Sequence, residues 1–77
     1  RAKLSFKEAR ELGELPAALA ALELEQAQFA RRLADPATYA DRSLDLKALN
    51  ARHAEIDAQL TRLLARWEEL ELRQGAN

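Results

Sequence analysis

The sequence predicts an all-α fold: an antiparallel two-helix coiled-coil hairpin, with a short N-terminal helix packed along the longer C-terminal helix. In two long stretches, leucines and other apolar residues recur at alternating spacings of three and four, which is typical of a coiled-coil seam. Between these stretches, residues 35–43 are too short to let the second helix run parallel to the first. The two long helices are therefore expected to lie antiparallel.

Start and stop signals define the elements. Ser5 and Glu8 fit a capping box that begins the short helix, and Gly13 is a natural end for it. Pro16 suits the first turn of the second helix, and Ser43 is expected to cap the third. The expected bounds are helix 5–12, helix 16–34, tip 35–43 and helix 44–74. Residues 1–77 then form one domain, which we expect to be excised from the C-terminus of a larger protein.

Each long stretch carries one polar residue inside its seam, Gln26 and His53. Folding the chain at the tip brings residues whose numbers sum to about 79 opposite one another, and this register pairs Gln26 with His53. A buried polar pair fixes the register of a coiled coil, so we interpret the two residues as a structural seam pair. The alternative for His53 is a pH switch.

The third expected helix is longer than the second, which leaves Trp67 and Leu70 without a partner. The same register brings the short N-terminal helix to this stretch. Phe6, Ala9 and Leu12 are expected to cover Trp67 and Leu70, with Trp67 as the structural anchor.

Composition excludes several classes of function. The formal net charge of −1 gives the chain no bulk attraction to nucleic acid or to an anionic membrane. There is no cysteine and only one histidine, so we expect no metal site, and no catalytic constellation or phosphate-cradling glycine loop occurs. No apolar run reaches the roughly 18 residues that a membrane span needs. The chain is therefore not expected to be an enzyme.

The distribution of charge along the chain is more informative than the net charge. Residues 1–10 carry four basic residues against Glu8, a local balance of +3, and residues 26–52 carry five against three aspartates, a balance of +2. The candidate nucleic-acid-binding residues are Lys3, Lys7 and Arg10 near the N-terminus and Arg31, Arg32 and Arg42 at the tip. The alternative is that these are ordinary helix-surface charges, solvated or paired at i,i+4.

Three segments together resemble a known family: KLSFKEARELGELPAAL at 3–19, LADPATYA at 33–40 and ARWEELE at 65–71. They are similar to the C-terminal domain of Uup-type ABC-F ATPases. The resemblance implies a coiled-coil hairpin associated with DNA binding, in a cytoplasmic parent protein that has two ATP-binding cassettes and acts on nucleic-acid machinery, chiefly the ribosome. ATP, Mg and ATP hydrolysis would belong to the parent, with no cofactor in this chain.

The leading interpretation is an accessory domain that binds DNA or ribosomal RNA electrostatically, with little sequence preference. The resemblance places basic residues at Lys3, Lys7 and Arg10, so these rank ahead for DNA, with the tip as a second contact to ribosomal RNA. The rival interpretation is a structural hairpin that docks on the parent's cassettes or self-associates. A monomer is expected under the leading interpretation.

Overall fold

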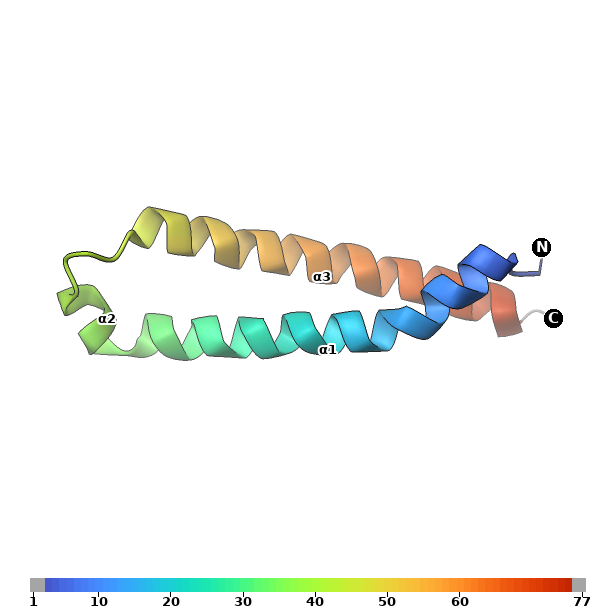
Figure 1. Cartoon of the computed structure of the whole chain (residues 1–77), viewed down its shortest axis with the longest axis horizontal. Coiled ribbons are helices and arrows are strands. Elements are labelled where there is room, and N and C mark those ends of the chain that lie inside the picture. The colour runs from blue at the N-terminus through green and yellow to red at the C-terminus, as the bar shows by residue number, and fades with distance from the viewer. Residues whose placement is uncertain (1–2, 76–77) are drawn as a thin grey trace.

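The computed structural model describes residues 3–75 as a helical hairpin, and the molecule measures 55 × 16 × 15 Å. The helices are α1 (Phe6–Ala34), α2 (Pro36–Ala40) and α3 (Leu46–Gly75). Figure 1 shows α1 and α3 running side by side in opposite directions, with α2 at one end. We name the end that carries α2 the tip and the opposite end, where α1 begins and α3 finishes, the open end. The predicted helical hairpin is confirmed.

The capping box predicted for α1 is confirmed. The Ser5 hydroxyl accepts a hydrogen bond from the Glu8 amide, and the Glu8 carboxylate accepts one from the Ser5 amide, both at 3.0 Å. These bonds satisfy two of the amides that a helix start leaves without partners. The N-terminal end of α1 therefore begins where the sequence predicts.

The break predicted at Gly13 is wrong, because residues 6–34 form one helix instead of two. A glycine inside a helix costs only about 1 kcal/mol relative to alanine. Burial of Leu12 and Leu15 on either side of it outweighs that cost. Pro16 lies inside the helix and removes one backbone hydrogen bond. In Figure 1 the first part of α1 bends near this region and crosses α3.

The core is a narrow stripe between α1 and α3, in two clusters. The cluster nearer the open end contains Leu12, Leu15 and Leu70, with Leu4, Leu63 and Trp67 packed against it. The second cluster contains Leu19, Ile56 and Leu60, with Leu22, Phe29, Leu63 and Trp67 packed against it. Leu63 and Trp67 contact both clusters.

The covering of Trp67 and Leu70 differs in part from the prediction. Leu12 packs with Leu70, but Phe6 is 84% exposed and Ala9 is exposed. The continuous helix, set by the packing of Leu12 and Leu15, leaves Phe6 in solvent, and Leu4 packs on this cluster instead.

Aspartates, not serine, cap the helices at the tip. Asp45 Oδ1 accepts from the Ala48 amide at 3.0 Å, so α3 begins at Leu46 and the predicted cap at Ser43 is wrong. The Ser43 amide and hydroxyl both donate to Asp41, at 3.0 and 2.6 Å, which uses Ser43 in a local turn.

The short helix α2 is tied to the end of α1 by its own side chains. The Tyr39 hydroxyl donates to the Leu33 carbonyl at 2.6 Å, and the Thr38 hydroxyl donates to the Arg32 carbonyl. Asp35 Oδ1 accepts from the Ala37 amide at 3.0 Å and caps α2. The tip is therefore a hydrogen-bonded structure and not an extended loop. Tyr39 therefore folds back to the end of α1 at Leu33.

Candidate nucleic-acid interface

Arg66 of α3 lies 3.9 Å from Glu8 of α1, and among the described residues three further ion pairs, all bidentate, join the two helices. In each, an arginine of α3 donates two hydrogen bonds, at 2.8–3.0 Å, to the two carboxylate oxygens of a glutamate of α1. The pairs are Glu8–Arg73, Glu11–Arg66 and Glu25–Arg52. We refer to them as the cross-helix ion pairs. Bidentate geometry fixes both side chains, so these three arginines hold the hairpin together and are not available to an outside partner.

The cross-helix ion pairs keep their carboxylates ionised. Hydrogen bonds from Arg73, and then from the Ser5 amide, lower the pKa of Glu8 to about 2. Arg66 lowers the pKa of Glu11, and Arg52 lowers the pKa of Glu25. Sequence analysis missed these pairs. The available signal was the run of charged residues beside each seam, which is where coiled coils place interhelical pairs.

The candidate residues at the tip are exposed and have no ion pair within residues 3–75. These residues are Arg31, Arg32 and Arg42, joined by Lys47 at the start of α3. The three aspartates nearby direct an oxygen to backbone amides instead. Hydrogen bonds from Ser43, with a smaller contribution from the charge of Arg32, lower the pKa of Asp41. The aspartates thus serve as caps while the cations face solvent.

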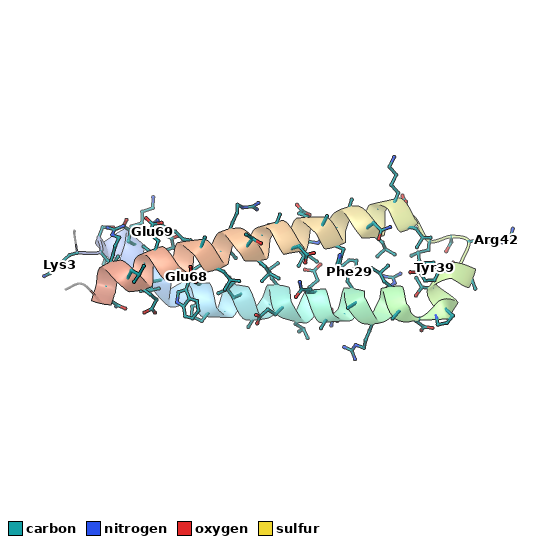
Figure 2. The ribbon with its side chains drawn as sticks, turned by 180° about the vertical axis from the view of Figure 1, so that it is seen from behind. Lys3, Phe29, Tyr39, Arg42, Glu68 and Glu69 are labelled. Atoms are coloured by element: carbon teal, nitrogen blue, oxygen red, sulfur yellow. The ribbon has the colours of Figure 1, made fainter. Side chains whose placement is uncertain are left out.

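The candidate residues at the open end lie in a more acidic setting. Lys3 and Lys7 are exposed, whereas Arg10 lies 3.7 Å from Glu14, with both side chains 72% exposed. Figure 2 shows Lys3 at the same end of the molecule as Glu68 and Glu69, and Arg42 at the opposite end. The tip candidates therefore lie at one end of the molecule and the N-terminal candidates at the other, so the two sets do not form one surface.

Gln26 and His53 share an acidic neighbour and do not bond directly to each other within the described residues. Gln26 Nε2 donates to Asp57 Oδ1 at 2.7 Å, and His53 Nδ1 lies 3.9 Å from Asp57 Oδ2. The His53 ring faces Phe29 instead, with ring centroids 6.2 Å apart. Because Phe29 occupies the place opposite His53, the partner of Gln26 lies one turn further along α3.

A hollow of about 170 Å³ is lined by Glu25, Gln28, Phe29 and Arg32. Ligand pockets are usually about 300–1,000 Å³, and Glu25 is already occupied by Arg52. Between residues 3 and 75 no cluster of histidine, cysteine and carboxylate side chains could hold a metal ion. None of the helices described has the length and apolar character of a membrane span.

Comparison with known proteins identifies a family and two relatives. Residues 3–72 match the family model of the ABC transporter C-terminal domain. Two proteins of Haemophilus influenzae, described as ATP-binding protein Uup-like and ATP-binding protein Uup, are each 41% identical over 73 residues. These alignments cover 90% of this chain but only 15% and 11% of the two relatives. No solved structure matches the chain significantly.

The match spans the elements that build the hairpin. It starts at Lys3, before the capping box of α1, and continues through the tip to Leu72 in the last turns of α3. The segments whose resemblance is visible in the sequence all lie inside it. The chain therefore belongs to the ABC transporter C-terminal domain family, as a domain of the Uup type.

Proposed function

We propose that this hairpin is a nucleic-acid-binding arm of a larger ATP-binding protein. It binds the phosphates of DNA or ribosomal RNA through exposed arginine and lysine, with little sequence preference. ATP, Mg and hydrolysis belong to cassettes elsewhere in the parent, which acts in the cytoplasm. The domain itself works as a monomer and supplies no catalytic group.

The observation that carries this proposal is that some basic residues form ion pairs between the helices, whereas others are exposed and unpaired within the described part of the chain. The cross-helix ion pairs use Arg52, Arg66 and Arg73, whereas the basic residues of the tip have no ion pair among residues 3–75. At the open end, Arg10 lies 3.7 Å from Glu14, and Glu68 and Glu69 occupy the same end of the molecule as Lys3. This distribution supports the tip as the stronger of the two contacts, and the open end as the weaker.

Salt dependence tests the proposal. The chain is titrated with duplex DNA at several salt concentrations, as the parent and as two triple variants: Arg31, Arg32 and Arg42 to glutamine, and Lys3, Lys7 and Arg10 to glutamine. Each lost phosphate contact lowers the slope of log K against log salt by about one. The tip variant is expected to lose two to three such units, roughly, and the open-end variant fewer.

Arg62→Gln is the matched control, because Arg62 is exposed in the middle of α3 and has no ion pair among residues 3–75. It removes one positive charge without touching either end, and its slope should equal that of the parent. The proposal would be contradicted if the DNA affinity of the parent and all variants did not depend on salt concentration, or if the parent did not bind DNA.

A second candidate function is docking on another part of the parent protein through the open end. Phe6 and Leu72 are 84% and 75% exposed, and both lie in the terminal turns of α1 and α3. Apolar docking survives salt concentrations that release phosphate contacts. Replacing both residues by serine would then weaken association with the parent's cassettes and leave DNA binding unchanged.

A further inference from the structure

The tip carries an exposed aromatic side chain as well as the candidate cations. Tyr39 is 55% exposed, and its hydroxyl donates to the Leu33 carbonyl at the end of α1. That bond holds the ring without burying it. Figure 2 shows Tyr39 at the tip end of the hairpin, the end at which Arg42 extends away from the helices.

The backbone that carries Tyr39 is itself held in place. Asp35 caps α2, and the Thr38 hydroxyl donates to the Arg32 carbonyl in the last turn of α1. An aromatic ring that is already positioned loses little conformational entropy when a second planar group stacks on it. The hydrogen bonds of the tip thus leave the ring exposed and preorganised.

The tip cations are near this ring in the sequence, and two of them lie in the turn of α1 to which α2 is hydrogen-bonded. Arg31 and Arg32 belong to the last turn of α1, to which α2 is bonded, and Arg42 follows Tyr39 by three residues. Arg32 lies close enough to Asp41 to lower the pKa of that carboxyl in part. Exposed aromatic faces flanked by arginine and lysine are the arrangement that binds unpaired nucleotides, with the nucleobase stacked and the phosphate paired with a cation.

We propose that the tip is a binding site for single-stranded nucleic acid, in which one unpaired nucleobase stacks on Tyr39 while its flanking phosphates meet Arg31, Arg32 and Arg42. This inference rests on the proposed function and deepens it, because it names the unpaired strand as the preferred partner. A duplex keeps its bases stacked inside and offers the tip only phosphates, so Tyr39 adds nothing to duplex binding.

The test compares Tyr39→Leu with the parent chain, using oligo(dT) and a duplex of matched phosphate number. Leucine removes the aromatic face and changes no charge. The expected result is roughly a tenfold loss of affinity for oligo(dT), an unchanged salt slope and unchanged duplex binding. The same loss is expected with oligo(U), since stacking uses the face of the base and not the sugar.

Two matched variants control for structure. Tyr39→Phe keeps the ring and removes only the hydroxyl that bonds Leu33, so affinity for oligo(dT) should remain within about threefold of the parent. Phe6→Leu removes an aromatic side chain that is even more exposed, at the far end, and should leave the affinity for oligo(dT) unchanged. Circular dichroism confirms that each variant keeps the hairpin.

The outcomes separate this inference from the proposed function. Equal losses with oligo(dT) and duplex after Tyr39→Leu would indicate a damaged tip and overturn the stacking site. Unchanged oligo(dT) affinity would overturn it as well. Salt-dependent binding in either case leaves the proposed electrostatic function standing, whereas a parent chain that binds neither probe removes both.

Discussion

At Gln26 and His53 the seam is polar where a leucine would otherwise pack. Both side chains are half-buried, and each lies beside Asp57 and not against the other. Among the described residues, no buried side-chain nitrogen or oxygen lacks a partner. A polar layer that water can reach costs little free energy to form, because water can bond to groups that have no partner in the protein. This polar layer is therefore not expected to be a large source of stability.

Replacing both Gln26 and His53 with leucine is expected to raise the melting temperature. Two leucines add apolar burial beside Phe29 and Ile56, while only a half-exposed hydrogen bond to Asp57 is lost. A gain of about 1 kcal/mol corresponds to roughly 4–8 °C in a domain of this size. Thermal denaturation followed by circular dichroism measures it. Gln74→Leu, at an exposed position, is the control, and a lower melting temperature in the double variant would contradict this account.

At the scale of the element, α1 shows how packing overrides local helix signals. Gly13 and Pro16 together predict an interruption, yet the helix continues through both. Leu12, Leu15 and Leu19 lie on one face and are all buried. Ending the helix at residue 13 would turn this face away from α3. The missing hydrogen bond of the proline instead appears as a bend that directs the start of α1 across α3 (Figure 1).

Gly13→Ala is therefore expected to stabilise the hairpin, by about 1 kcal/mol. Gly13 has no positive φ, and an added Cβ would meet nothing within 4 Å. The gain comes from the reduced backbone freedom of the unfolded chain. Gly75→Ala is the matched control, because it is equally open but stands at the last residue of α3 and should gain much less. Urea denaturation compares the two. A loss of stability in Gly13→Ala would show that the bend requires glycine.

The whole molecule is a long two-helix hairpin with a thin core. Among residues 3–75, seven hydrophobic side chains are buried, and two of them, Ile56 and Leu70, are completely inaccessible. Such a core supplies limited hydrophobic stabilisation, so interactions across the helices carry more weight than in a globular domain. Two of the three cross-helix ion pairs, at Glu8 and Glu11, lie in the first two turns of α1, where the core comes from one cluster alone.

Acid is expected to weaken the hairpin. The pKa of Glu8 falls from 4.5 to about 2 on folding, and the pKa values of Glu11 and Glu25 also fall. A carboxyl whose pKa is lowered by folding contributes stability above its unfolded pKa, and this is lost as pH falls through the folded value. The melting temperature should therefore be steady from pH 7 to about 5 and drop between about pH 4.5 and 2.

Charge-neutral variants identify the groups responsible for this drop. In Glu8→Gln combined with Glu11→Gln, the melting temperature at pH 7 should already be lower, and its further decrease on acidification should be smaller. Glu68→Gln is the control, since Glu68 is exposed and takes part in no ion pair among the described residues. Melting temperatures that are equal at pH 7 and pH 3 in the parent would contradict a role for the cross-helix ion pairs.

The sequence by itself determined the hairpin, its turn and its family. The seam spacing, the capping box at Ser5 and Glu8, and the Asp35-Pro36 turn are local patterns, and local patterns specify where helices lie and which faces are apolar. The exposed cations of the tip were also visible, because a cluster of charges beside a turn is a feature of the sequence alone.

Only the tertiary structure decided which polar groups meet. Glu8 and Arg73 are 65 residues apart, and Gln26 and Asp57 are 31 apart, so their contacts depend on register and on side-chain reach within a fraction of a turn. Tertiary structure also decided that α1 is continuous. Burial of Leu12 and Leu15 against α3 outweighs the tendency of Gly13 to end a helix. Tyr39 became a candidate stacking residue only once its hydroxyl was seen to be bonded and its ring exposed. Local preferences amount to about 1 kcal/mol each, and contacts between distant segments outweigh them.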